Sequence, residues 1–381
     1  MKTKRFLPGA RLRRGAAIVL SALVLVACSG DSKPKPAELP ANPDLIGLSQ
    51  AWSFKLPEVK FPLVSDVSDD VVVVAGGEKG TVLAIDARTG KELWRVDVGV
   101  SLNAGVGSDG TLAAVVTREN ELVAIQGGEI LWKKKLSAET FTPPLVAGRR
   151  IFVQGADRAT SAWDGQSGRR LWTQTRPAEA LVLKRPGVLQ AVNDALVTGI
   201  GARLVAMNPA NGASVWEAPI ASPRGTNDVE RLVDLTGTIS VAGGTICARA
   251  YVAAVGCVDG NRGTLVWTKP SSGSEGVTGD ENTLYGAEQN GVVTAWRRRD
   301  GEQIWSTDAL KYRQLTAPLA AGRALILGEG SGNLLLLSRD DGKLLARVSP
   351  DGSAIAADPV LVAGTLVVVT AKGGVFGYRP K

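Results

Sequence analysis

Tryptophan recurs along most of this chain at a nearly regular interval, and each copy ends a similar stretch of sequence. Three of these stretches read GTVLAIDARTGKELW (80–94), ARLVAMNPANGASVW (202–216) and GVVTAWRRRDGEQIW (291–305). Each combines an alternating apolar run, a polar turn with glycine, and a second run that ends in tryptophan. The repeated positions are Trp52, Trp94, Trp132, Trp172, Trp216, Trp267 and Trp305, with Ala346 in the eighth place, at intervals that average 42 residues. Repetition of this kind predicts a chain built from similar structural units.

The pattern inside each unit indicates strands. Two-residue alternation bounded by Gly, Asp and Asn is typical of short antiparallel strands. A further apolar run lies upstream of each pair, such as PLVAGRRIFVQG (144–155). Four strands in one 42-residue unit match a propeller blade. We interpret the repeated tryptophan as a flat ring packed between neighbouring blades, and the repeated glycine as the turn residue.

The two ends of the chain complete the repeat. KGGVFGYR (372–379) resembles the first half of a unit and lacks the tryptophan half, which LSQAWSF (48–54) supplies. One blade would therefore contain strands from both termini, and the ring would have no open edge between its first and last blade. Residues 46–381 number 336, which is eight units of 42. We predict an all-β, eight-bladed β-propeller of four-stranded antiparallel blades, closed by its N- and C-terminal strands.

The N-terminal residues are expected to form a targeting segment rather than a part of the fold. Residues 1–14 are basic, and Ala16–Val26 is an apolar run of 11 residues, too short to span a bilayer as a helix. Leu25-Val26-Ala27-Cys28 resembles a bacterial lipobox. This resemblance implies a signal peptide over 1–27 and acylation of Cys28, by palmitate among other chains; an ordinary secretory signal is the alternative. By resemblance to bacterial sorting rules, Ser29 permits export to the outer membrane.

Residues 28–45 follow as a polar linker. They contain four prolines, Pro34, Pro36, Pro40 and Pro43, and few apolar groups. Such a composition is typical of an extended, solvated tether. We therefore expect a propeller over 46–381 that is held away from the membrane by this segment.

Composition excludes several functions. The net charge of +7 includes six basic residues of the signal peptide; the remainder has 38 basic against 37 acidic residues, which gives no field for nucleic acid. The chain has no histidine, which excludes Ser-His-Asp and Cys-His catalysis and disfavours a metal site. No GxSxG, CxxC or phosphate-loop motif is present. We predict no catalytic residue, no metal and no cofactor.

The repeat DARTGKELW (86–94) resembles the tryptophan-docking motif of quinoprotein dehydrogenases, which are also eight-bladed. That resemblance implies a periplasmic enzyme with pyrroloquinoline quinone near two adjacent cysteines and a calcium ion. Here Cys247 and Cys257 are ten residues apart, and no adjacent pair exists. They are expected on adjacent strands, opposite each other, as a candidate disulfide or as two buried thiols. A ligand-binding lipoprotein propeller is a further alternative.

The longest interval, 51 residues from Trp216 to Trp267, carries its extra length in 219–244. Within it, RGTNDVERLVDL (224–235) resembles a segment of the BamB family, the propeller lipoproteins of the outer-membrane β-barrel assembly (Bam) machinery; its RL-x-D part is the most discriminating. The resemblance implies a non-enzymatic scaffold on the periplasmic side of the outer membrane. It also implies binding to the periplasmic domains of BamA, with nascent outer-membrane proteins as further partners.

The same resemblance implies two contact loops. The partner-binding residues would be Leu181, Leu183, Lys184, Arg185, Glu230, Arg231, Asp234 and Thr236. Lys184 stands where the family has arginine, with Arg185 as the alternative one residue later, and Thr236 stands where the family has a second aspartate. We expect Leu181 and Leu183 to face one way along a strand, flanked by the charges of Lys184, Arg185 and Asp234.

Overall fold

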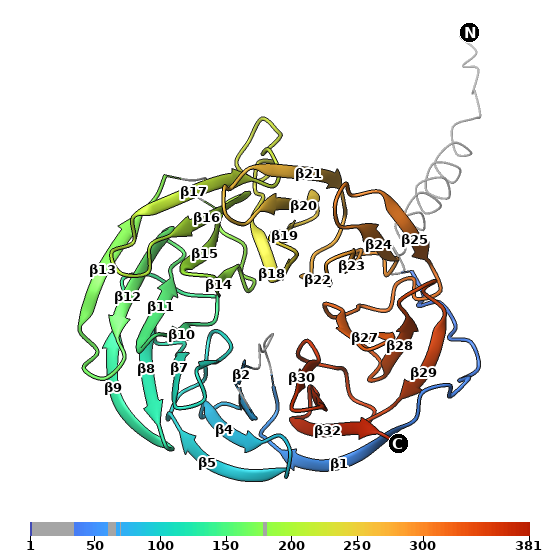
Figure 1. Ribbon diagram of the computed structural model, residues 1–381, viewed down its shortest axis with the longest axis horizontal. Coiled ribbons are helices and arrows are strands. Elements are labelled where there is room, and N and C mark those ends of the chain that lie inside the picture. Colours follow the sequence, from blue (N-terminus) through green and yellow to red (C-terminus); the bar gives the residue numbers. More distant parts are fainter. Residues whose placement is uncertain (2–33, 60–65, 69, 178–180) are drawn as a thin grey trace. The chain divides into compact units, whose positions relative to one another are not determined.

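The computed structural model describes Met1 and residues 34–59, 66–68, 70–177 and 181–381. The compact unit Pro36–Lys381 consists of eight four-stranded antiparallel sheets arranged as the blades of a ring (Figure 1). In each blade the first strand is innermost and the last is the outer edge. The predicted eight-bladed propeller is confirmed. Among the described residues, no helix has the length and apolar character needed to cross a membrane.

Blades 1 to 4 follow the chain. Blade 1 contains β2 (Asp66–Ser68), β3 (Val71–Gly76), β4 (Thr81–Asp86) and β5 (Lys91–Asp97). Blade 2 contains β6 (Gly107–Ser108), β7 (Leu112–Val116), β8 (Glu121–Gln126) and β9 (Glu129–Lys135). Blade 3 contains β10 (Leu145–Ala147), β11 (Arg150–Gln154), β12 (Ala159–Asp164) and β13 (Arg170–Thr175). Blade 4 contains β14 (Leu189–Val192), β15 (Ala195–Ile200), β16 (Arg203–Met207) and β17 (Ser214–Pro219).

Blades 5 to 8 complete the ring. Blade 5 contains β18 (Leu235–Ala242), β19 (Thr245–Ala250), β20 (Ala254–Asp259) and β21 (Leu265–Pro270). Blade 6 contains β22 (Val277–Gly279), β23 (Thr283–Ala287), β24 (Val293–Arg297) and β25 (Gln303–Thr307). Blade 7 contains β26 (Leu319–Ala321), β27 (Ala324–Gly328), β28 (Leu334–Ser338) and β29 (Leu344–Val348). Blade 8 contains β30 (Val360–Val362), β31 (Thr365–Val369), β32 (Gly374–Pro380) and β1 (Leu48–Lys55).

Blade 8 closes the ring with both ends of the chain, as the sequence predicts. Its strand order is β1-β32-β31-β30, and Trp52 of β1 lies opposite Gly377 of β32. The innermost strands β30 and β2 also contact each other, which joins the last blade to the first. The middle strands of the blades are almost fully buried, so the apolar core consists of sheet faces pressed against neighbouring sheets.

The repeated tryptophans connect successive blades. Each lies on an outer strand, and in six of the seven the indole Nε1 donates a hydrogen bond to a backbone carbonyl in the turn of the next blade. The donor–acceptor pairs are Trp52–Ala87 (3.0 Å), Trp132–Gly165 (2.9 Å), Trp172–Pro209 (3.0 Å), Trp216–Gly260 (3.1 Å), Trp267–Arg298 (2.6 Å) and Trp305–Arg339 (2.9 Å). The ring also covers the turn glycine: Gly90 has a φ of 70°, and a Cβ there would lie 2.4 Å from Trp52. Glycine is therefore required for both backbone and space.

On the two outer strands of a blade, a large side chain on one strand lies opposite a small one on the other. Trp94 lies opposite Ala84 and Trp267 opposite Cys257, so each bulky ring is accommodated by a small partner. In blade 7 the order is reversed, because Ala346 lies opposite Leu336. Both of those side chains are buried. The apolar volume is thus kept in the blade that lacks the tryptophan.

The proline-rich segment differs from the expectation of a solvated tether. The compact unit begins at Pro36, ten residues before the expected boundary at 46. From Ala37 onward the segment has no regular secondary structure but is hydrogen-bonded to the propeller. The Ala37 N–H donates to the Lys311 carbonyl, in the connection between blades 6 and 7, at 2.9 Å, and the Leu45 N–H donates to the Leu345 carbonyl of blade 7 at 2.8 Å. Cys28 and the expected signal peptide lie outside the described residues.

Candidate functional site

The residues implied by the sequence resemblance lie on two connections that meet. Residues 181–187 lead from blade 3 into blade 4, and residues 221–234 lead from blade 4 into blade 5. Gly187 and Thr236 form an isolated antiparallel bridge. Next to it, the Gly237 N–H donates to the Pro186 carbonyl at 2.9 Å. The two predicted loops are therefore joined by backbone contacts.

Asp234 is buried beneath the first loop. Its Oδ2 accepts a hydrogen bond from the Leu183 N–H at 2.9 Å, and its Oδ1 accepts one from Arg158 Nη1 at 2.6 Å. Arg158 also donates through Nη2 to the Leu181 carbonyl at 2.6 Å. The side chain of Asp234 is 9% exposed. The expectation that Asp234 presents its charge on the surface is wrong, since both carboxylate oxygens are engaged inside the protein.

Arg158 is the residue that sequence reasoning missed. It lies in the turn between β11 and β12, and its backbone has a φ of 62°. Its guanidinium connects blade 3 to both loops through a planar array of donors, which suits a carboxylate and a carbonyl at once. Nothing in the sequence GADRAT (155–160) distinguishes it from other turn arginines.

The leucines of the first loop do not form a strand. Residues 181–183 have irregular backbone, because the Leu181 carbonyl and the Leu183 amide bind Arg158 and Asp234 instead of a neighbouring strand. Leu181 is 39% exposed, while Leu183 is half-buried. The expected pair of leucines facing one way is therefore corrected to one exposed apolar side chain supported from below.

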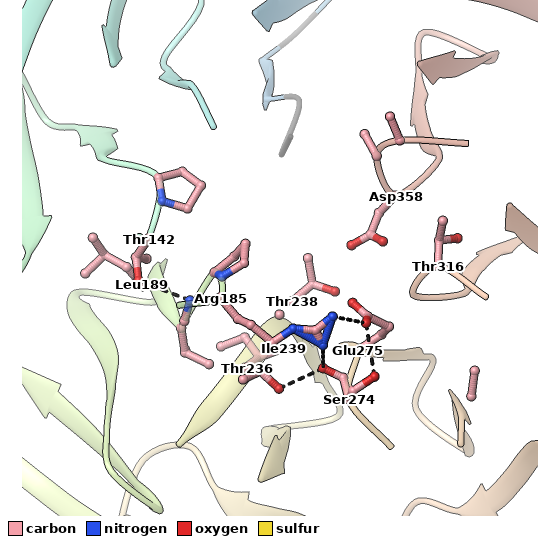
Figure 2. A pocket seen from close by; sticks show the side chains of 18 of the residues that line it. Thr142, Arg185, Leu189, Thr236, Thr238, Ile239, Ser274, Glu275, Thr316 and Asp358 are labelled. Carbon is pink, nitrogen blue, oxygen red and sulfur yellow. Dashed lines mark hydrogen bonds and ion pairs between the residues drawn. The ribbon is translucent and has the colours of Figure 1, made fainter. Parts of the chain in front are cut away.

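The two adjacent cations of this loop serve different surroundings. Lys184 is exposed, with Nζ 3.9 Å from a Glu139 carboxylate oxygen and 5.4 Å from the centre of the Phe141 ring. Arg185 turns inward, where it binds Glu275 at 2.9 Å (Figure 2). Its guanidinium also lies 5.6 Å from the centre of the Tyr251 ring. The two cations are therefore adjacent in the sequence but face different surroundings, and the one-residue shift from Lys184 to Arg185 stays a prediction.

The second connection divides into an exposed part and a buried part. Residues 222–231 are exposed; we call them the arm. Within the arm, Glu230 accepts the Thr226 N–H at 2.8 Å, and Asn227 Oδ1 accepts the Glu230 N–H at 2.9 Å. The Thr226 N–H holds the pKa of Glu230 below its ordinary value. Arg231 belongs to the arm, whereas Thr236 is buried and donates through Oγ1 to the Ser274 carbonyl at 3.0 Å.

Arg185 borders a cavity of about 950 Å³ at the centre of the ring. Figure 2 shows Arg185 and Glu275 on one side and Asp358 on the other. Asp358 accepts the Ala317 N–H at 2.9 Å. Asp358 is half-buried where it lines this cavity, and this burial, reinforced by the charge of Glu275, raises its pKa to about 7. Within the described ranges, no cluster of three His, Cys, Asp or Glu side chains is placed to hold a metal ion.

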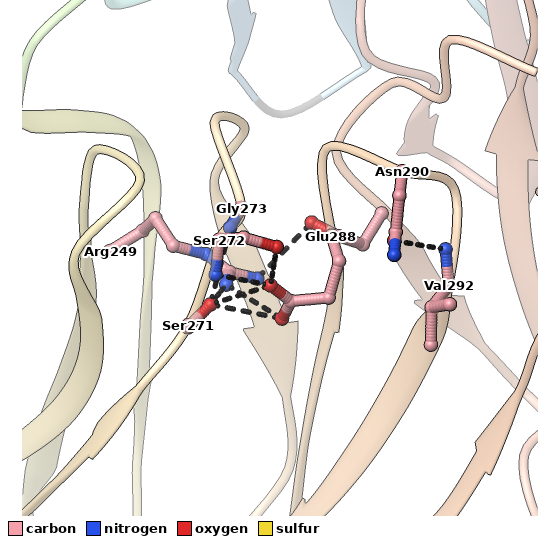
Figure 3. Close-up of polar contacts among 8 residues, drawn as sticks. Arg249, Ser271, Ser272, Gly273, Glu288, Asn290 and Val292 are labelled. Atoms are coloured by element: carbon pink, nitrogen blue, oxygen red, sulfur yellow. Dashed lines mark hydrogen bonds and ion pairs between the residues drawn. The ribbon is translucent and has the colours of Figure 1, made fainter. Parts of the chain in front are cut away.

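A second arginine cluster lies between blades 5 and 6 (Figure 3). Arg249 is fully buried and lies 3.1 Å from Glu288, which also accepts Ser271 Oγ at 2.9 Å. The guanidinium is 5.7 Å from the centre of the Trp296 ring. Burial lowers the pKa of Arg249, and the charge of Glu288 opposes that shift. These contacts join adjacent blades and hold the connection that begins at Ser271, which also carries Glu275, the partner of Arg185.

Comparison with known proteins identifies the family. Residues 78–307 match a family profile described as outer membrane protein assembly factor BamB. A relative of that name from Burkholderia pseudomallei is 38% identical, over 97% of this chain and 99% of the relative. This chain belongs to the BamB family. Similarly named relatives from Bordetella pertussis (32% identical; 98% of each chain) and Pseudomonas aeruginosa (30% identical; 94% and 96%) also span nearly the full length.

Solved structures share the fold of this BamB-family chain. BamB from Moraxella catarrhalis has a TM-score of 0.79 at 22% identity, covering 87% of this chain and all of that one. Quinohemoprotein alcohol dehydrogenase from Comamonas testosteroni has a TM-score of 0.65 at 15% identity, covering 90% and 78%. Identities this low show the fold alone. The propeller is thus shared by assembly factors and dehydrogenases, and function has to be argued from the loops.

The two cysteines of this BamB-family chain are paired within blade 5. Cys247 and Cys257 lie directly opposite each other on β19 and β20 and form a disulfide, with Cα atoms 4.0 Å apart. Both side chains are buried beside Trp267. This bond connects two middle strands of one sheet, ten residues apart. It differs from the ring of adjacent cysteines that the quinoprotein resemblance implies.

Proposed function

We propose that this chain is a non-enzymatic scaffold of the Bam complex, which assists the assembly of outer-membrane β-barrel proteins by binding the periplasmic domains of BamA. Acylated Cys28 anchors it to the outer membrane, and the propeller faces the periplasm. Membership of the BamB family supports the assembly role. The proposed contact with BamA is supported by the loop 181–185, whose backbone is held by Arg158 and Asp234.

The loop has the properties of a small recognition site. Leu181 offers an exposed apolar side chain and Lys184 an exposed charge beside it. Binding is favoured when the contacting backbone is already ordered, because less conformational entropy is lost on association. Arg158 and Asp234 supply this order without touching the partner, and the arm adds charged groups at the edge of the same surface.

Leu181→Asp tests the BamA contact. The substitution places a charge in the apolar centre of the surface and should weaken binding to purified BamA periplasmic domains at least tenfold, since central apolar contacts dominate such interfaces. Leu93→Asp is the matched control, because Leu93 is 45% exposed on the outer strand of blade 1. Affinity is measured by calorimetry, and folding by thermal unfolding. Equal affinities for both variants would remove the loop from the interface.

The scaffold role has an enzymatic rival in the dehydrogenase-like fold. An absorption spectrum of protein purified from its own membrane separates the two, because a bound quinone absorbs in the near ultraviolet and visible range. We expect no such band, and co-purification with BamA. A stoichiometric chromophore would contradict the non-enzymatic assignment.

A further inference from the structure

The segment 37–45, which we call the strap, follows the outer rim of blade 7 before the chain enters β1 (Figure 1). Its first fixed point is Ala37, whose N–H donates to the Lys311 carbonyl at 2.9 Å. The Ala37 carbonyl accepts Arg313 Nε at 2.8 Å and also Nη2 of the same guanidinium. Arg313 is itself held by Glu329, a fully buried carboxylate, at 3.3 Å. The strap therefore begins on a charged pair rooted inside blade 7.

The middle of the strap covers the free edge of β29. The side chain of Asn42 acts as a peptide group: its Oδ1 accepts the Arg347 N–H at 2.9 Å, and its Nδ2 donates to the Arg347 carbonyl at 3.2 Å. Farther along, the Leu45 N–H donates to the Leu345 carbonyl at 2.8 Å. The strap thus satisfies backbone groups that an outer edge strand leaves open to other chains.

Apolar packing and proline complete the attachment. Leu39 packs against the core shared by blades 6 and 7, which includes Leu310 and Leu315. Pro40 and Pro43 have no N–H to pair, and they restrict the unbound segment. Their presence lowers the entropy lost when the strap docks. The strap is therefore attached by backbone hydrogen bonds, by the Arg313 guanidinium, by the Asn42 side chain and by apolar packing. It is docked on the propeller, although its composition is that of a linker.

We propose that the strap shortens the leash, by which we mean the chain between Cys28 and the first residue fixed on the propeller. Blade 7 is thereby held as the part of the propeller nearest the membrane. The proposal rests on acylation of Cys28, which is part of the proposed function. Whatever their conformation, the nine steps from Cys28 to Ala37 span at most about 32 Å. A leash that ran free to Leu48 could span about 72 Å. A compact body of the length Pro36–Lys381 is roughly 50 Å across. Only the free leash would let every rim approach the anchor.

The proposed BamA-binding loop begins on the opposite side of the ring, where it leaves blade 3, and leads toward the central cavity that Arg185 borders. Blade 3, which supplies Arg158, is four blades away from blade 7. Figure 1 shows blade 3 across the ring from blade 7 and the strap. With blade 7 tied close to the bilayer, blade 3 and the start of the loop 181–185 lie on the side of the ring away from the bilayer, where a periplasmic partner is accessible. The strap accordingly sets orientation as well as distance.

Depth measurements on the full acylated protein in phosphatidylethanolamine–phosphatidylglycerol vesicles test this orientation. Asp340→Cys in blade 7 and Gln166→Cys in blade 3 place one free thiol at equivalent exposed turns, six residues before Ala346 and Trp172. Each thiol carries a fluorophore, and a nitroxide on the lipid headgroup quenches it. We expect at least twofold stronger quenching at 340 than at 166. Equal quenching would overturn the orientation.

Release of the strap provides the decisive comparison. Leu39→Ser with Asn42→Ala removes the apolar contact and the two side-chain hydrogen bonds to Arg347, and should bring the quenching ratio close to one. Glu38→Gln, at an exposed neighbouring position, should leave the ratio unchanged. Hydrogen exchange of residues 37–45 should be slow in the parent and at least tenfold faster in the double variant. The proposal is contradicted if the double variant still exchanges slowly and its quenching ratio is unchanged. It is also contradicted if the strap is released in the double variant and the quenching ratio does not change. Mass spectrometry of Cys28 separates the cases: an unacylated cysteine refutes the anchor itself, whereas an acylated protein with equal quenching refutes the strap.

Discussion

The two connections of the candidate site are fixed in opposite ways. Loop 181–187 is held by other blades: Arg158 and Asp234 bind its backbone, and Arg185 reaches Glu275. In the arm 222–231, Thr226 and Glu230 are hydrogen-bonded to each other, four residues apart. The first loop is therefore held by residues far away in the sequence, while the turn 226–230 of the arm is held by its own neighbours. The order of this turn should be easier to lose than that of the first loop.

This difference predicts which substitutions damage the fold and which affect only a surface. Asp234→Ala should have the largest effect. It removes both acceptors of the buried pair and leaves Arg158 without its carboxylate, which costs about 3 kcal/mol in the free energy of unfolding. BamA binding should weaken as well, because Leu181 and Leu183 lose their support. Chemical unfolding and calorimetry measure the two effects.

A double variant separates the stability of the pair from its positioning role. Arg158→Met with Asp234→Leu replaces the buried charges by apolar side chains of similar size, and should recover at least half of the lost stability. The backbone groups of Leu181 and Leu183 still lack partners, so binding to BamA should stay weak. A double variant that binds like the parent would show that the pair does not position the loop.

The central cavity, which Arg185 borders and Asp358 lines from another connection, gives a pH-dependent prediction. The raised pKa of Asp358, about 7, means that the folded protein retains a proton that the unfolded chain releases near its ordinary pKa. Stability should therefore fall as pH rises from 4 to 7 and then level off. Asp358→Asn, which removes this titration, should raise the melting temperature at pH 7.5 more than at pH 5. Thermal unfolding across this pH range measures the effect, and an equal shift at both values would contradict it.

The fold was readable from the sequence because every blade repeats the same local demand. Each Trp needs a small residue opposite it and a glycine in the next turn, so the pattern recurs at each blade and at the seam. The site was only partly readable. Glu230 and Asp234 look alike in ERLVD (230–234), but Asp234 is buried because Arg158, 76 residues away, meets it. The strap was read as a linker for the same reason, since Arg347 is 305 residues from Asn42.

The arm gives the smallest effect and the sharpest test of the comparison. Glu230→Ala removes the acceptor of the Thr226 N–H, so amide exchange within 222–231 should quicken while the unfolding midpoint of the protein stays the same. Because the folded arm lowers the pKa of Glu230, its order should be present above the ordinary glutamate pKa and lost as pH falls below it. Exchange measured on the parent at pH 6 and pH 3.5, after correction for the intrinsic rate, checks this. If Glu230→Ala lowered the unfolding midpoint as Asp234→Ala is expected to do, the arm would be coupled to the blades, and the division between an integrated loop and an independent turn would not hold.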